Sequence, residues 1–351
     1  MKYLRKKIYL SGLLVISCQA FAQTKAILDP EEEFISGKNT IWSPLFQASW
    51  DQLNAFHQGA PERVEPPNAL IDKLNSYDWN EDSVFPENSH QIFAGPATRD
   101  FYSKTAKVIK EKYQIDLPPV QNYDPTHNLV YGALARNVEF KTPFFRSKKK
   151  PLSFTTSTGK THSSAFFGTA GKASANFGEN VRVLNHEDHG KAFILSISTM
   201  QEEEFLIVYQ DPETKSFQQA IQNIRGFQQT RGASYLHKGD VVKIPYLRLN
   251  SHTDFSSQLQ GSRYYQGEPT PWRIVSAFQI TEFELFEKGA QVRIATGTHD
   301  APFGPLPPKP KPRHFICDLP FVVFLWREGA ELPYFATRID NTEALTPFEE
   351  K

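Results

Sequence analysis

The spacing of apolar side chains changes along the chain, from a helical pattern early to a strand pattern late. In Phe101–Tyr113, apolar and small side chains recur every three or four residues and lysines fill the other face, which predicts an amphipathic helix with Asp100 as its N-cap. β-Branched and aromatic residues dominate six later segments, which are predicted to be strands: Phe193–Ser198, Phe205–Tyr209, Val241–Leu249, Trp272–Thr296, Phe321–Trp326 and Tyr334–Ile339. Helices followed by strands are typical of an α+β domain built on antiparallel sheets.

One predicted strand is long and two-faced. Between Phe278 and Phe286, apolar and polar residues alternate, as expected for a strand that buries one face. The segment 302–312 that follows is rich in proline, which lacks the backbone donor that a sheet interior needs. We therefore expect this segment to be an exposed loop of polyproline type.

The N-terminus is typical of an export signal. Basic residues precede the apolar run Ile8–Ser17, and the triplet Ala20-Phe21-Ala22 has the pattern of a cleavage site. We expect residues 1–22 to be a signal peptide and the mature protein to be periplasmic or extracellular. The run is too short to span a bilayer and no second one follows, so no transmembrane segment is expected. A lipid anchor on Cys18, in a segment that resembles a lipoprotein cleavage box, is the alternative.

Charge and cysteine content narrow the class of protein. The 351 residues include 39 basic and 39 acidic ones, so the charge does not favour nucleic acid as a partner. Once the signal is removed, Cys317 is the one cysteine left, so packing rather than an intrachain disulfide must stabilise the fold. We expect Cys317 to be a small core residue.

No group of residues predicts catalysis. The sequence has no G-x-S-x-G elbow and no recognisable pair of nucleophile and base, so we expect neither an enzyme nor a cofactor. His186–His189 fits a polar loop better than a metal site, and no metal is expected. A basic run is a candidate for binding a polyanion, although such runs are more often solvated loops. It comprises Arg146, Lys148, Lys149 and Lys150.

Segments spread from Asn39 to Asp340 carry a family resemblance. Phe315–Trp326 matches the pattern F-x-A-D-x-P-F followed by an apolar strand, with Cys317 at the alanine position, and Phe335–Ile339 is similar to F-x-G-R-V. Four other segments match family patterns in the right order: Asn39–Leu45, Leu129–Phe144, Phe154–Gly171 and Ile244–Phe255. The chain resembles a divergent, bacterial-type member of the serpins, the serine protease inhibitor superfamily.

The resemblance implies an α+β serpin fold in a single domain, residues 23–351, with three β-sheets, surrounding helices and a reactive-centre loop at about 289–314. In this family a protease cuts the exposed loop, which then inserts into the large sheet and carries the acyl-enzyme with it. This implies a monomeric, single-use inhibitor of an extracytoplasmic serine or cysteine protease. Spacing within the family pattern puts the scissile region at Phe303-Gly304 or near Leu306.

Departures from the family pattern favour the alternative, a non-inhibitory binding protein on the same scaffold. The positions that match the family's hinge are Glu287, Gly289, Ala290, Gln291, Val292, Arg293, Ile294, Ala295 and Thr296. Val292, Arg293 and Ile294 replace alanines, and stiff β-branched side chains favour a loop root fixed in a strand. The prolines of the loop also withhold backbone donors that a protease needs.

Two further departures concern the large sheet. A cluster of Ser, Ser, Asn and His governs sheet opening in the family, and the matching positions here are Ser43, Phe46, Gly132 and Gln279. Most of the hydrogen-bonding groups are thereby lost, and a partly dismantled buried network is a poor switch. The short passage from Tyr113 to Leu129 also implies that the helix that usually covers the sheet is deleted.

Overall fold

The computed structural model describes residues 24–120, 122–147, 149–169, 177–187, 191–230, 234–259, 261–267, 271–274, 276–290 and 311–349. Several predictions concern residues outside these ranges. They are the signal peptide with Cys18, the basic Lys148, the hinge positions Gln291, Val292, Arg293, Ile294, Ala295 and Thr296, and the candidate scissile residues Phe303, Gly304 and Leu306.

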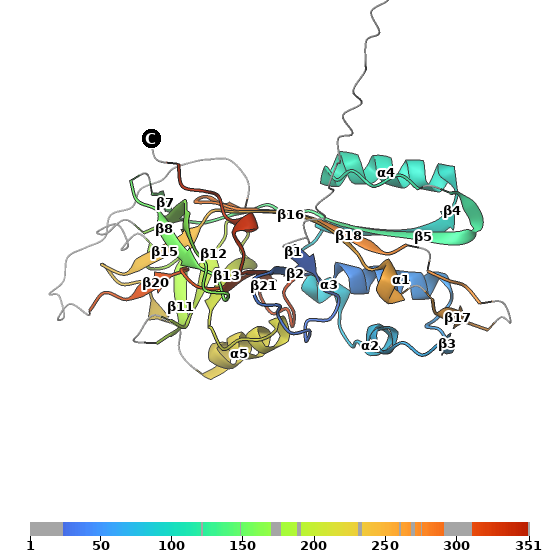
Figure 1. Cartoon of the computed structure of the whole chain (residues 1–351), viewed down its shortest axis with the longest axis horizontal. Coiled ribbons are helices and arrows are strands. Elements are labelled where there is room, and N and C mark those ends of the chain that lie inside the picture. Colours follow the sequence, from blue (N-terminus) through green and yellow to red (C-terminus); the bar gives the residue numbers. More distant parts are fainter. Residues whose placement is uncertain are drawn as a thin grey trace, which may run out of the picture.

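An eight-stranded sheet combines strands from the two ends of the described chain with strands from its middle (Figure 1). Its order is β1-β2-β22-β21-β13-β12-β11-β14. The strands are β1 (Thr24–Ala26), β2 (Asn39–Trp42), β11 (Val181–His186), β12 (Phe193–Ser198), β13 (Glu204–Gln210), β14 (Ser234–Tyr235), β21 (Phe321–Arg327) and β22 (Phe335–Ile339). β21 pairs antiparallel with both β13 and β22, so that Phe324 lies opposite Ile207 on one side and Ala336 on the other.

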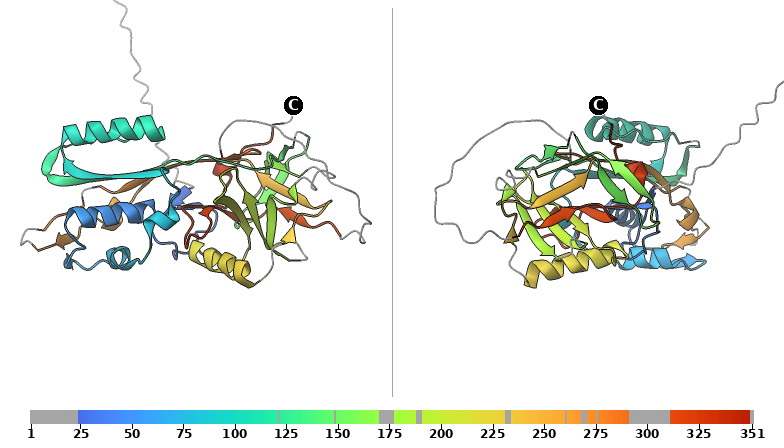
Figure 2. Two further views of the ribbon diagram at one scale, coloured as in Figure 1. Left: turned by 180° about the vertical axis from the view of Figure 1, so that it is seen from behind. Right: turned by 60° about the vertical axis from the view of Figure 1, so that its left-hand side comes forward.

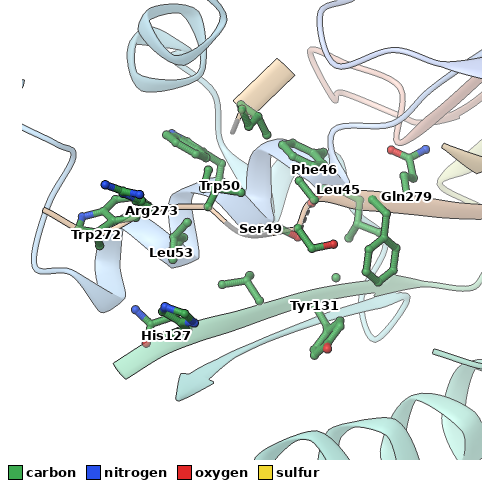
Figure 3. Close-up of a pocket in the computed structure, with 18 of the residues that line it drawn as sticks. Leu45, Phe46, Ser49, Trp50, Leu53, His127, Tyr131, Trp272, Arg273 and Gln279 are labelled. Carbon is green, nitrogen blue, oxygen red and sulfur yellow. Dashed lines mark hydrogen bonds between the residues drawn. The ribbon is translucent and has the colours of Figure 1, made fainter. Parts of the chain in front are cut away.

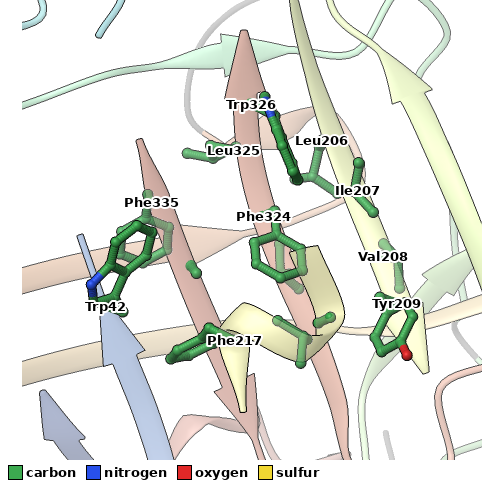
Figure 4. Packing of buried hydrophobic residues seen from close by; sticks show 14 of the residues in the cluster. Trp42, Leu206, Ile207, Val208, Tyr209, Phe217, Phe324, Leu325, Trp326 and Phe335 are labelled. Carbon is green, nitrogen blue, oxygen red and sulfur yellow. The ribbon is translucent and has the colours of Figure 1, made fainter. Parts of the chain in front are cut away.

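Both faces of this sheet are covered, which explains why its central strands are apolar almost throughout. Helix α5 (Phe217–Thr230) lies across one face, where Phe217 packs edge-on against Phe324 with ring centroids 6.2 Å apart (Figure 4). On the opposite face, Phe315 packs edge-on against Phe193 at 5.7 Å. Phe193 and Phe324 are fully buried. Cys317 is also fully buried, as the sequence predicts, and burial raises the pKa of its thiol.

A four-stranded sheet of order β20-β15-β10-β7 supplies part of that second cover. Its strands are β7 (Phe145–Arg146), β10 (Phe166–Gly168), β15 (Val241–Pro245) and β20 (His314–Ile316). β8 (Leu152–Thr155) and β9 (Thr161–Ser164) form a hairpin nearby, and β3 (Arg63–Glu65) pairs with β17 (Arg263–Tyr265). The residues from 311 onward return to the fold at β20, which pairs parallel with β15.

Two separate ladders stand where the resemblance implies one large sheet. β4 (His90–Ala97) pairs antiparallel with β5 (Asp124–Leu134), and β16 (Leu247–Asp254) pairs antiparallel with β18 (Phe278–Leu285). The β4–β5 ladder lies between helix α1 (Leu45–Phe56) and helix α4 (Arg99–Tyr113) (Figures 1 and 2). Gly132 allows β5 to approach α1 closely, because a Cβ at this position would lie 2.5 Å from the Ser49 hydroxyl oxygen.

Helix α4 begins two residues earlier than the sequence suggests. Thr98, not Asp100, is the N-cap: its hydroxyl oxygen accepts a hydrogen bond of 3.2 Å from the Phe101 amide. Asp100 lies instead in the first turn, where its carboxylate favours the helix dipole and pairs with Lys104 at 2.7 Å. In the described residues between Tyr113 and Asp124 there is no helix, and α4 itself lies across the β4–β5 ladder (Figure 1).

The fold is α+β, as predicted. The remaining helical segments are α2 (Ala69–Ser76), α3 (Glu81–Val84), α6 (Ser256–Leu259) and the 3-10 helix η2 (Thr342–Ala344). The predicted strand Trp272–Thr296 is wrong at its start, since Trp272 makes only an isolated bridge with Tyr264 and strand β18 begins at Phe278. The predicted strand Val241–Leu249 is divided at Tyr246, where the chain passes from the four-stranded sheet to the β16–β18 ladder. None of the described helices is long and apolar enough to cross a membrane.

Candidate functional site

A cleft separates β5 from β18. Each strand has a partner on its outer side, β4 or β16, but no ladder joins β5 to β18 in the part of the chain that the structure describes. Two strand edges therefore face each other without pairing across the gap. A single strand placed between them would satisfy backbone donors and acceptors on both sides.

The cleft contains two cavities that share Leu45, Ile115, Gly132, Gln279 and Ile280 in their walls. One, of about 570 Å³, lies beside Arg136, Asn137 and the second half of β18, and we call it the hinge-side cavity. The other, of about 650 Å³, lies between α1, the first half of β5 and the segment 271–280, and we call it the distal cavity (Figure 3). Because these residues belong to both walls, the two cavities adjoin along the strands, and together we call them the channel.

The chain reverses direction at the head of this channel. Phe286 and Gly289 exchange backbone hydrogen bonds of 3.0 and 3.1 Å, which close a two-residue turn immediately after β18. The short strand β19 (Gly289–Ala290) then pairs antiparallel with β6 (Val138–Glu139), which follows β5. β19 therefore lies between the continuations of β5 and β18, and it runs back in the direction of the cleft.

Gly289 is required at this turn. Its φ is +130°, a conformation that side chains rarely adopt, and a Cβ there would lie 2.2 Å from the carbonyl oxygen of Val138. The sequence motif places a glycine at the hinge, and this close approach supplies the physical reason for it.

Glu287, the first hinge residue, is held on both its backbone and its side chain. Its carbonyl accepts a hydrogen bond of 2.7 Å from the Phe144 amide. Its carboxylate accepts a hydrogen bond of 2.6 Å from the Tyr246 hydroxyl. Burial, followed by the neighbouring Glu287 carboxylate, raises the pKa of Tyr246 well above its usual range, so the phenol remains the donor.

All four positions of the predicted switch line the cleft, yet no hydrogen bond joins any two of these described side chains. The Ser43 hydroxyl donates to the Tyr334 carbonyl at 2.9 Å, and Phe46 packs edge-on against Phe255. Gln279 donates to the Thr281 hydroxyl at 3.1 Å, while its side-chain oxygen is buried without a partner. The structure therefore brings these residues together without making them a network.

A buried charge cluster beside the hinge-side cavity was not predicted. The Arg136 guanidinium, just after β5, forms two hydrogen bonds to the Glu204 carboxylate, one of them 2.9 Å from Nε, and the Tyr334 hydroxyl donates to the same carboxylate at 2.9 Å. The hydrogen bonds that Arg136 donates to Glu204 raise the pKa of Arg136, and burial raises the pKa of Tyr334. Glu204 follows Arg136 by 68 residues. No local motif connects them, so sequence patterns could not reveal the pair.

The described members of the basic run do not form a closed anion site. Arg146 lies on β7, with its guanidinium 5.6 Å from the Tyr246 ring centroid, and Lys149 and Lys150 are exposed. The Ser147 hydroxyl donates to the Lys150 carbonyl at 2.9 Å, so this segment is organised by its own backbone. His186 ends β11, whereas Asp188 and His189 lie outside the described residues.

Comparison with known proteins places the fold. No protein-family model matches the sequence, and no curated protein matches it. Among solved structures, tengpin, a thermophilic serpin in its native state, is 14% identical with a TM-score of 0.56 and 90% coverage of each chain. Serpin48 of the insect Tenebrio molitor is 13% identical with a TM-score of 0.50, over 88% of this chain and 92% of that one. Human thyroxine-binding globulin in complex with thyroxine is 12% identical with a TM-score of 0.50, over 87% of this chain and 92% of that one.

Proposed function

Because this chain has the serpin fold, we propose that it is an exported, single-use inhibitor of a serine or cysteine protease. Its loop 289–314 is the bait, and the cut loop enters the cleft between β5 and β18. One observation supports this above all others: the turn at Phe286–Gly289 starts an antiparallel strand at the head of a channel whose two strand edges are joined by no ladder among the described residues. The protein acts as a binding reagent and has no catalytic role.

The register of β19 defines which hinge residues would face the core. Gly289 lies opposite Glu139 and the next residue lies opposite Val138, which is fully buried. Residues directly opposite in an antiparallel pair share a face, and side chains alternate between faces. Val292 and Ile294 would thus share the core face of Val138, whereas Gln291 and Arg293 would face outward. Val292 and Ile294 stand where the family hinge has alanine, and as β-branched residues they would pack well on the buried face of a strand.

Because the cleft is open, loss of the hydrogen-bonding switch residues does not by itself argue against insertion of the loop. A hydrogen-bonded cluster is needed where it must hold two strands together and release them on demand. Here the two strands are not paired, so insertion requires no such release. Ser43, Phe46, Gly132 and Gln279 form the floor of the path instead.

We further propose that residues 1–22 direct export, after which the mature single domain is free or is anchored through Cys18. The partner is then a protease of the same extracytoplasmic space, with cleavage close to Phe303 or Leu306. The N-terminal residue and the mass of the mature protein distinguish the two forms, because a lipid-anchored chain would begin at a modified Cys18.

The test is cleavage of the mature protein by a chymotrypsin-like protease, followed by a denaturing gel and thermal unfolding. We expect an SDS-stable covalent adduct and a rise in Tm of at least about 10 °C for the cut protein, which corresponds to roughly 5 kcal/mol for a large domain. Replacing Val292, Arg293 and Ile294 by alanine tests the hinge. Clean cleavage products with an unchanged Tm, in both the natural chain and this variant, would rule out inhibition.

A non-inhibitory binding protein is the second candidate. The observation that favours it is the set of bulky side chains along the distal half of the path, where the Trp272 and His57 rings are stacked 4.4 Å apart. A loop that had to pass these rings would insert only partly. In that case cleavage gives no adduct, and the intact protein binds a ligand or partner without being consumed.

A further inference from the structure

We propose that the distal cavity is a binding site for a long-chain amphipathic carboxylate, with the aliphatic chain between β5 and α1 and the carboxylate at Arg273. The site lies in the distal half of the path proposed for the cut loop, and it operates in the intact, uncut protein, in which this path is still free. It rests on the shape of the cavity, on unpaired polar atoms in its wall and on the charge at its edge.

The shape of the cavity fits an extended chain. Its wall follows β5 from His127 to Gly132, which is about 17 Å at a rise of roughly 3.3 Å per residue. The volume of about 650 Å³ lies within the usual range for small-molecule sites. Aliphatic side chains from four parts of the fold contribute to the wall: Leu45 and Leu53 of α1, Ile109 of α4, Val130 of β5 and Ile280 of β18.

Polar atoms without partners are concentrated in the same wall. Trp272 Nε1, Gln266 Oε1 and Gln279 Oε1 are buried, have no hydrogen-bond partner and belong to residues that line the cavity. Buried polar groups almost always have a partner, so three exceptions in one wall point to a partner that is supplied from outside the chain. A carboxylate would accept from the indole N–H, and its bound water would donate to the amide oxygens.

The rings around Trp272 hold it rigidly. His57 stacks on one part of the indole at 4.4 Å, and Tyr264 stacks on it at 4.3 Å. The Asn128 amide lies 3.0 Å from His57 Nε2, and since the amide nitrogen is a donor, the imidazole accepts with this atom. Burial lowers the pKa of His57, in keeping with a neutral ring. Trp272 is thus positioned without charge, while its N–H remains free for a ligand.

The charge at the edge of the cavity selects an anion. No acidic residue lines the distal cavity in the described part of the chain, and Arg273 is the one lining residue with a permanent charge. Its side chain is exposed next to Trp272 (Figure 3), and no described carboxylate pairs with it. An unpaired guanidinium beside an apolar channel matches a ligand with an apolar body and one carboxylate.

The probe is dodecanoate below its micellar concentration, titrated into the intact mature protein by calorimetry and by tryptophan fluorescence. We expect saturable binding with one site and a change in emission, because Trp50 and Trp272 line the cavity. Arg273→Gln should weaken dodecanoate at least about 10-fold, as expected for the loss of a charged hydrogen bond, and should leave dodecanol binding unchanged. Arg225→Gln, on the exposed face of α5, is the matched control and should bind as the natural protein does.

Dodecylammonium is the control ligand, because it carries the opposite charge on a carbon chain of the same length as that of dodecanoate. Binding as tight as that of dodecanoate would show unspecific apolar adsorption and overturn the proposal. The absence of saturable dodecanoate binding would overturn it too, and so would equal losses in the Arg273 and Arg225 variants. Because no protease is present, a missing covalent adduct has no bearing on this result.

Discussion

At the scale of the residue, Gly289 shows why a family motif requires glycine at one position. A motif match marks the position, but only the structure shows that β19 approaches β6 so closely that a side chain would collide with the backbone of Val138. The Arg136–Glu204 pair shows the opposite case. Its two members lie far apart in the sequence and carry no pattern, although they join the end of β5 to the eight-stranded sheet.

Gly289→Ala should destabilise the protein by about 3 kcal/mol, because it combines a disfavoured φ with a backbone collision. Gly329→Ala is the matched control: its φ is +78°, but nothing lies within 4 Å of the added Cβ, so a loss of only about 1 kcal/mol is expected. Urea unfolding of the two variants measures the difference. Equal losses would mean that the approach of β19 to Val138 is not maintained in solution.

Glu204→Gln should cost about 3 kcal/mol, because the Arg136 guanidinium would keep its partly buried position without a countercharge. The neighbouring Glu203 is a natural control, since its side chain is 70% exposed and pairs with Arg327 at the surface. Glu203→Gln should cost less than about 1 kcal/mol. Similar urea midpoints for the two variants would contradict a structural role for the buried cluster.

At the scale of the element, single strands and helices were predictable, whereas the cleft was not. Helix α4 and strands β12 and β18 follow from the local periodicity of apolar residues, which indicates the face that each element buries. Whether β5 pairs with β18 depends on backbone groups that every residue carries, and so it leaves no signal in the side chains. The family patterns did bring Ser43, Gly132 and Gln279 to one place, but they could not show that the cleft beside them is open.

Acid should weaken the attachment of β20, the element that ends the loop. Asp240 is buried immediately before β15. Burial opposes its ionisation, but hydrogen bonds from Arg313 and His237 keep its pKa below the usual value. A carboxyl with a lowered folded pKa contributes stability above its unfolded pKa and loses this contribution as the pH falls through the folded value. Tm should therefore fall steeply below about pH 4, where unfolded aspartate begins to take up protons.

Asp240→Asn separates this effect from general acid denaturation. The variant should have a lower Tm at pH 7 and a smaller further loss between pH 5 and pH 3 than the natural protein. Asp116→Asn, at an exposed pair with Lys110, should change neither the value at pH 7 nor the slope. A Tm profile for Asp240→Asn that runs parallel to the natural one would show that this carboxyl does not contribute to acid sensitivity.

At the scale of the whole molecule, one cluster of buried residues extends from Ala26 to Leu345 and includes members of α1, the eight-stranded sheet and β16. A shared core of this extent supports the proposal of a single domain. A smaller cluster lies between α4 and β5, around Ile109 and Tyr131. The β4–α4–β5 unit therefore has a core of its own, against which Phe278 at the start of β18 also packs.

The position of β21 and β22 in the sequence limits how much of the protein can fold during synthesis. β4, α4 and β5 are neighbours in sequence and can assemble while the chain is still emerging, because their contacts close short loops. The complete eight-stranded sheet cannot assemble this early. Thr40 of β2 pairs with Arg338 of β22, and β21 and β22, which join β2 to β13, are synthesised last. A nascent chain thus remains without its central strands until Ile339 has been added. Such a late closure would leave the chain incompletely folded during synthesis, as the proposed export across a membrane requires.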